Sequence, residues 1–90
     1  MPTIIPHALP GDFRSASLFG ISAEGIEHAL GFPPNADDEA SKVSHSWGFT
    51  VDGERCGVWC YRGSEKLGEW SAFGPVSALR KVFGSHVQHD

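Results

Sequence analysis

The sequence has little positive charge, and its lysine and arginine residues gather nowhere into a cluster. It holds 7 basic and 11 acidic residues, which gives a formal net charge of −4. Residues 1–41 are the acidic part, with six acids and one base. Most non-specific affinity for DNA and RNA comes from basic patches that displace counterions. We therefore expect no direct binding to nucleic acid.

Long hydrophobic runs and an export signal are also missing. No stretch approaches the roughly 18 apolar residues of a membrane span. The N-terminal sequence MPTIIPHALPGDF has no basic segment and is interrupted by prolines, unlike a secretory signal. There are only two cysteines, and without an export signal they predict free thiols in a reducing compartment. These features predict a soluble cytoplasmic protein with no membrane partner.

Recognisable catalytic and metal-binding motifs are absent from the sequence. It contains neither a phosphate-binding glycine loop nor a GxSxG nucleophile motif. The acidic run Asp37, Asp38 and Glu39 lacks the alternation of a calcium loop, which favours a solvated loop. Cys56 and Cys60 would lie about 13 Å apart on a strand, too far to share a zinc ion or form a disulfide. We predict no metal site and no cofactor.

A cysteine and a histidine could still face each other across the predicted hairpin. His45 is expected opposite Cys60, at the proximity that a Cys-His dyad needs. The sequence offers the pair no orienting Asn or Asp and no evident oxyanion donors. A buried thiol beside a hydrogen-bonded histidine explains both residues, and we predict that the protein is not an enzyme.

Ninety residues predict one domain, which we divide into an irregular arm over 1–20, an α+β domain over 21–84 and a tail over 85–90. A helix is predicted over Ala23–Leu30. Ser22 is suited to its N-cap, and Gly31 to its C-terminal stop.

The rest of the domain is predicted to be three strands and a second helix. Apolar and small residues alternate from Val43 to Val51, Asp52-Gly53 is typical of a type I′ hairpin turn, and a strand from Arg55 to Arg62 returns. A third strand is expected over Glu69–Phe73. PVSALRKVFG then predicts a helix that opens at its proline and ends at its last glycine. The fold class is α+β: a three-stranded antiparallel sheet with both helices on one face.

The hairpin turn assigns a face of the sheet to every residue of its two strands. With Asp52 and Gly53 as the loop, positions that sum to 105 are paired, so Trp47, Phe49, Val58 and both cysteines point into the core. Trp59 and Tyr61 point the other way, beside small residues. We take this outer face as the candidate binding site. Its predicted residues are Trp59, Tyr61, Arg55, Arg62, Ser44 and Ser46, with Trp70 added if the third strand turns it outward.

Three uses of this outer face stay open at this point. The N-terminal arm could cover it with Ile4, Ile5 and Phe13. A protein partner or a second copy of the chain could bind it, because Trp, Tyr and Arg are enriched at interface hot spots. A nucleotide-type ligand could stack on it, with Arg55 and Arg62 meeting its phosphates.

Three runs of the sequence resemble small, uncharacterised proteins encoded by bacteriophages: KVSHSWGFTVDGERCGVWCYRGS, EWSAFGP and ALRKVFG. In those proteins a Trp-bearing hairpin, a WS-x-FG strand and a closing helix recur. The resemblance covers roughly residues 42–84. It implies a phage or prophage accessory protein, similar in kind to inhibitors of host defence such as anti-CRISPR proteins and proteins that sequester nucleotide immune signals.

We therefore expect a non-enzymatic phage-type protein that docks on a host defence protein and inhibits it in the cytoplasm of an infected or lysogenic bacterium. The first alternative is an oligomer that binds a nucleotide-type immune signal on the aromatic face of the hairpin. The second alternative is a Cys-His enzyme.

Overall fold

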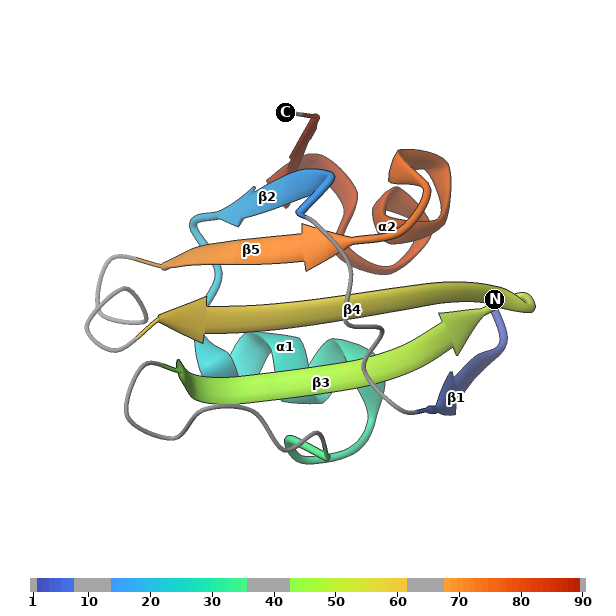
Figure 1. The fold of residues 1–90 in the computed structure, drawn as a ribbon, viewed down its shortest axis with the longest axis horizontal. Helices are drawn as coiled ribbons and strands as arrows, with labels where there is room; N and C mark the ends of the chain where they lie inside the picture. The colour runs from blue at the N-terminus through green and yellow to red at the C-terminus, as the bar shows by residue number, and fades with distance from the viewer. Residues whose placement is uncertain (1, 8–13, 36–42, 62–67, 90) are drawn as a thin grey trace.

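The chain forms a six-stranded antiparallel sheet with two α-helices on one of its faces (Figure 1). This computed structural model describes residues 2–7, 14–35, 43–61 and 68–89, without the side chains of residues 43, 44 and 61. The strands lie in the order β1-β3-β4-β5-β2-β6. Along the chain the elements are β1 (Ile4–Pro6), β2 (Ala16–Phe19), α1 (Ala23–Leu30), β3 (Val43–Val51), β4 (Glu54–Tyr61), β5 (Glu69–Phe73), α2 (Val76–Phe83), the 3₁₀ turn η2 (Gly84–His86) and β6 (Val87–His89).

The α+β class is confirmed, but the prediction of a three-stranded sheet is wrong. The segment 1–20 supplies β1 and β2, and the segment after α2 supplies β6. β1 pairs with β3, whereas β2 lies between β5 and β6. These extra strands have only three or four residues, too few to show the alternation by which a strand is recognised in sequence.

Helix α1 begins and ends where the sequence predicts. The Ser22 side chain accepts a hydrogen bond from the Gly25 N–H at 3.1 Å, which caps the first turn. Gly31 ends the helix in the left-handed conformation, at φ 90°. Ile26 and Leu30 are buried against the sheet. Neither α1 nor α2, the α-helices of the described chain, has the length and apolar character needed to cross a membrane.

The hairpin of β3 and β4 has the predicted register over most of its length. The pairs run from Val51 with Glu54 to His45 with Cys60, around a turn in which both central residues have positive φ. Beyond His45 a bulge shifts the register, so Val43 pairs with Tyr61. The expected pairing of Val43 with residue 62 is therefore wrong, and Arg62 itself lies outside the described residues.

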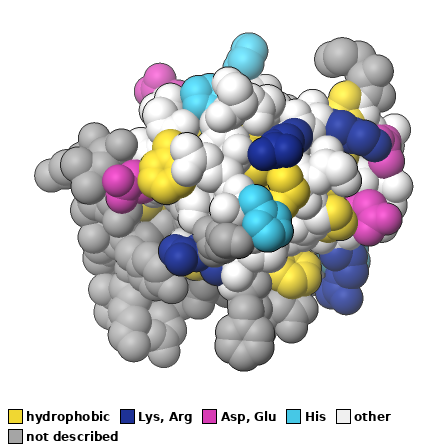
Figure 2. All heavy atoms as spheres, turned by 90° about the horizontal axis from the view of Figure 1, so that it is seen from above, with side chains coloured by type: hydrophobic (Ala, Val, Ile, Leu, Met, Phe, Trp, Pro, Cys, Tyr) yellow, Lys and Arg dark blue, Asp and Glu magenta, His cyan; other side chains and the backbone are white. Residues whose placement is uncertain are grey.

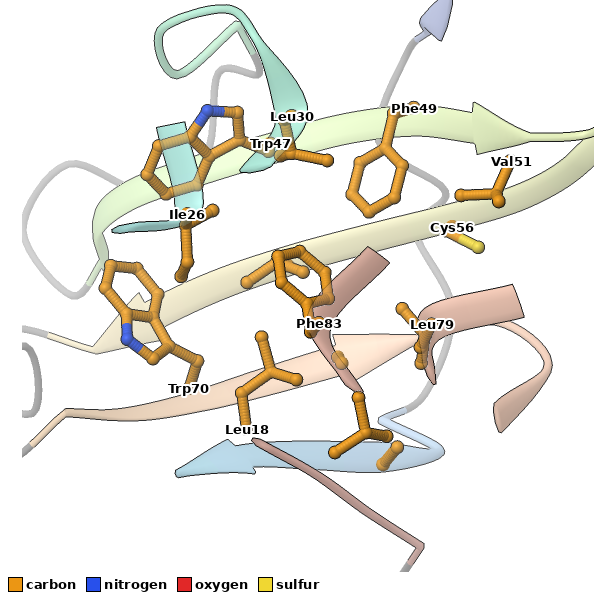
Figure 3. Packing of buried hydrophobic residues seen from close by; sticks show 14 of the residues in the cluster. Leu18, Ile26, Leu30, Trp47, Phe49, Val51, Cys56, Trp70, Leu79 and Phe83 are labelled. Atoms are coloured by element: carbon orange, nitrogen blue, oxygen red, sulfur yellow. The ribbon is translucent and has the colours of Figure 1, made fainter. Parts of the chain in front are cut away.

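Two tryptophans tie both ends of α1 to the sheet. The Trp70 indole N–H donates to the carbonyl of Ile21 at 2.8 Å, just before the helix. The Trp47 indole N–H donates to the carbonyl of Phe32 at 3.1 Å, just after it. The two ring centroids lie 5.6 Å apart, edge to face. Figure 3 shows Ile26 of α1 beside the two rings, and this residue is fully buried in the same core cluster.

The hairpin turn also holds β1 and α2. One carboxylate oxygen of Asp52 accepts from the Thr3 N–H at 2.7 Å, and the other lies 3.2 Å from the Lys81 ammonium on α2. The hydrogen bond from the Thr3 backbone, followed by the one from Lys81, lowers the pKa of Asp52 below its ordinary value of 3.8. One exposed side chain thus links the hairpin turn to two segments that are distant in sequence, the residue before β1 and helix α2.

β1 and Asn35 together cover the outer edge of β3. The His7 N–H donates to the Gly48 carbonyl at 2.9 Å, which continues the pairing of β1. The Asn35 amide group donates to the same carbonyl at 2.9 Å and accepts from the Gly48 N–H at 2.9 Å. Polar groups of β3 that would otherwise be a template for another strand are therefore already bonded.

Replacing either indole by a phenyl ring is expected to destabilise the fold. Trp47→Phe and Trp70→Phe each remove an N–H donor and leave a main-chain carbonyl without its partner, a loss of about 1–3 kcal/mol. Urea denaturation measures the free energy of unfolding. Trp59→Phe is the matched control, because no hydrogen bond of its indole occurs among the described residues. A loss in the control as large as in the two variants would contradict the role of these bonds.

The contribution of Asp52 to stability is expected to depend on pH. Because folding lowers the pKa of Asp52, its ionised form stabilises the native state above the pKa of a free aspartate, about 3.9, and this contribution is lost as the pH falls through the lowered value. Asp52→Asn should therefore be less stable than the wild type at neutral pH, and the difference should shrink in acid.

Urea midpoints measured between about pH 2 and pH 7 test this dependence. Glu54→Gln, which removes a carboxylate from another exposed position of the hairpin end, is the control. A difference between wild type and Asp52→Asn that stays constant over the whole range would refute the proposed role.

Candidate functional site

The centre of the outer sheet face is covered rather than open. A row of side chains crosses four strands there, because Ser46 pairs with Trp59, Trp59 with Ser71, and Ser71 with Ser17. All four residues are at most 9 % exposed, although they point away from the helices. The Trp59 ring is therefore not a free surface on which a ligand could stack.

The predicted site residues do not all gather on this face. Trp70 points to the helix side and is 2 % exposed, so the aromatic face does not include it. Ser46 and Trp59 lie on the outer face but are buried, whereas Arg55 lies there and is exposed. Tyr61 and Ser44 belong to the strands, but their side chains are outside the described residues, as is all of Arg62.

Cover by the N-terminal arm is the first of the three predicted uses of this face. Ile4, on the edge strand β1, is half-buried and packs against the core cluster. Ile5 is 55 % exposed. Phe13 lies outside the described residues. The two described isoleucines of the arm therefore do not seal the aromatic face.

A cleft opens at the end of the sheet where the β3–β4 hairpin turn lies beside the end of β5, on the right of Figure 1. Its volume is about 520 Å³, within the range of about 300–1,000 Å³ that ligand sites occupy. It is open rather than enclosed. Its described lining consists of Ser15, Gly53, Glu54, Arg55, Phe73, Gly74 and Pro75.

Strand pairing places an arginine and an aromatic ring together in this cleft. Phe73 pairs with Gly57, and Arg55 lies two residues from Gly57 on the same face of β4. Gly57 itself pairs with Gly48, and both glycines are buried. Phe73 is half-buried, whereas Arg55 is exposed and makes no hydrogen bond or ion pair among the described residues. The cleft thus combines an exposed cation with an aromatic ring.

A hydrogen-bonded clamp fixes the back of the cleft. The Ser15 hydroxyl donates to the Gly74 carbonyl at 3.0 Å and accepts from the Gly74 N–H at 3.2 Å. Gly74 has a φ of 123°, and a Cβ there would lie 2.7 Å from the Cys56 sulfur and 2.9 Å from the Arg55 carbonyl. Position 74 therefore requires glycine. At this position the end of β5 lies in close contact with β4, the strand that carries Arg55.

The two thiols of the hairpin are buried in the core, and its histidine is half-buried. Burial is the larger cause that raises the pKa of Cys56 to about 11, and the negative charge of Glu54 is the smaller one. This thiol therefore stays protonated at neutral pH. Cys60 is 1 % exposed and donates to the Glu69 carbonyl at 3.5 Å. His45 pairs with Cys60 as predicted, but its ring stacks on Trp47 with centroids 6.0 Å apart. Within the described chain, no three His, Cys, Asp or Glu side chains are grouped to hold a metal ion.

The remaining described surface offers no broad apolar patch. Among the described residues, the large hydrophobic side chains that are well exposed are Ile5 and Phe19, on β1 and β2. These two strands lie on opposite sides of β3, β4 and β5 in the sheet. Figure 2, which views the molecule from above, shows hydrophobic side chains separated by basic, acidic and histidine side chains. A second and smaller cleft, of about 140 Å³, lies beside Phe19, Glu69 and Arg14.

Comparisons with protein-family models, with curated proteins and with solved structures gave no match to this chain.

The clamp at Gly74 predicts a strong effect of a single added methyl group. Gly74→Ala is expected to cost roughly 2–5 kcal/mol of stability, because it adds backbone strain to a close contact with Cys56 and the main chain. Gly53→Ala is the control: its φ is also positive, at 87°, but nothing lies within 4 Å of the added atom, so only about 1–2 kcal/mol should be lost. Thermal and urea unfolding measure both. Equal losses would mean that the contact at Gly74 is unimportant.

Proposed function

We propose that this chain is a non-enzymatic binding protein that docks on another protein and blocks it, in the manner of phage accessory proteins that inhibit a host defence protein. The phage origin rests on the resemblance of residues 42–84. The observation that carries the docking proposal is the cleft at the hairpin end, where Arg55, which has no partner among the described residues, lies with the half-buried ring of Phe73. Arginine and aromatic side chains often dominate interface binding energy.

The shape of the cleft favours a protein partner over a small molecule. Small-ligand sites enclose about 70–90 % of their ligand's surface. The cleft is open, which suits a side chain that protrudes from a larger surface. The Cys60 thiol that faces His45 is buried and donates to the Glu69 carbonyl, and the His45 ring stacks on Trp47, which supports a binding role rather than nucleophilic catalysis.

One observation favours a second candidate function, the sequestration of a nucleotide-type signal. The cleft has the volume of a small-ligand site and carries a guanidinium group that can bind phosphate. The buried Trp59 removes the stacking surface on which this alternative was first based. It now rests on the cleft alone, either in one chain or between copies of the chain.

Affinity capture with matched variants tests the docking proposal. The immobilised protein should retain a specific bacterial protein, Arg55→Glu should lose it, and Arg80→Glu on the exposed surface of α2 should keep it. Native mass measurement of the purified pair gives the stoichiometry. Retention by Arg55→Glu as strong as by the wild type would show that the cleft does not carry the docking.

The same variants separate the second candidate from the first. A rise of several degrees in the melting temperature with cyclic nucleotides, lost in Arg55→Glu, would identify a ligand-sequestering protein, because a ligand stabilises the state that it binds. An unchanged melting temperature together with Arg55-dependent capture supports docking on a protein.

A further inference from the structure

We propose that the cleft recognises a carboxylate that lies next to an apolar side chain in the docked partner, in other words an Asp or Glu beside an aromatic or aliphatic residue. This inference rests on the proposed docking function and names the chemistry of its contact. Its elements are the guanidinium of Arg55 and the ring of Phe73, which line the cleft together.

The charges around the cleft select an anion. Arg55 is the one cation of the described lining, and it has no partner among the described residues. The acid of the lining, Glu54, belongs to the other face of β4, because neighbours on a strand alternate and Glu54 pairs with Val51. The negative charge of Glu54 also acts on the buried Cys56, which lies on that same inner face. The guanidinium is thus left available to an incoming negative group.

The donors of the cleft favour a carboxylate over a phosphate. A guanidinium presents two parallel N–H groups that match the two oxygens of a carboxylate. A phosphate site commonly adds further cations or free backbone N–H groups. Here the Gly74 N–H is already bonded to the Ser15 hydroxyl, and that hydroxyl in turn donates to the Gly74 carbonyl. One bidentate cation is therefore the main polar contact that the described cleft offers.

The Phe73 ring beside Arg55 favours an apolar group next to the carboxylate of the partner. The Phe73 ring is half-buried, so part of it can pack against an apolar group of the partner. Pro75, which is exposed, lines the cleft next to that ring. A residue pair that places an apolar side chain on Phe73 and a carboxylate on Arg55 therefore fits both features at once.

Two dipeptides that differ only in charge test this recognition: N-acetyl-Phe-Glu-amide and its neutral counterpart N-acetyl-Phe-Gln-amide. Amide resonances of ¹⁵N-labelled protein should shift around Gly53, Arg55 and Gly74 on titration with the acidic dipeptide. The neutral dipeptide should bind about fivefold more weakly, which corresponds to about 1 kcal/mol, the upper value for an exposed ion pair. Arg55→Met should abolish the preference, and Arg80→Met should leave it unchanged.

Other outcomes of the titration overturn the inference. They are equal affinity for the two dipeptides, shifts that fall on α2 around Arg80 and Lys81 instead of the cleft, and a preference that survives in Arg55→Met. Inorganic phosphate provides a further comparison, and binding of phosphate in the cleft at least as tight as that of the acidic dipeptide would also refute the choice of a carboxylate.

The inference and the docking function can fail separately. If a captured partner binds Arg55→Met as well as it binds the wild type, the carboxylate inference is wrong while docking itself stands. If the acidic dipeptide binds the cleft as expected but the whole protein captures no partner, the docking function is wrong while the cleft still selects a carboxylate.

Discussion

Two indole hydrogen bonds connect both ends of helix α1 to the sheet. Helix α1 has only eight residues, and helices of that length are not stable alone in water. Trp70 bonds the main chain just before the helix and Trp47 just after it, while Ile26 is buried in the same core cluster as the two rings. Helix α1 is thus stabilised by hydrophobic burial, and the two indole hydrogen bonds determine where it lies on the sheet.

Because two of the three tryptophans face the helices, few large side chains remain for the other face of the sheet. With Trp47 and Trp70 committed to the helix side, the outer positions at the centre of the sheet carry serine, glycine and Trp59, and they are covered. Exposed charge and a partly exposed ring meet instead at the hairpin end, where Arg55 and Phe73 line the cleft. The candidate site is therefore at the end of the sheet rather than on its centre.

Much of the fold was predictable because its signals are local. The cap at Ser22, the stop at Gly31 and the Asp52-Gly53 turn each act within a few residues, and they gave the helix bounds and most of the hairpin register correctly. β1, β2 and β6 were missed because each is short and pairs with a distant segment. No local pattern encodes such a pairing.

The site was predictable only in part, for the same reason. Arg55 follows from the hairpin alone, since its face is set by the turn. The direction of Trp70 and the place of Phe73 depend on how β5 pairs with β4 and β2, and a five-residue strand with small residues on both faces does not reveal this. Ser15 was missed because its role appears only when β2 lies beside β5 and its hydroxyl meets Gly74. The Gly74-Pro75 sequence was the local signal that β5 ends there.

The order of the strands has a consequence for how the chain reaches this structure. β2 is made early, but both of its partners come late: its residue Phe19 pairs with Glu69, and Ala16 pairs with His89. Contacts this far apart in sequence are slow to form, because a long loop must close before they stabilise anything. During synthesis β2 therefore emerges from the ribosome long before a partner exists for it, and the sheet is completed only when the final residues of β6 have been released.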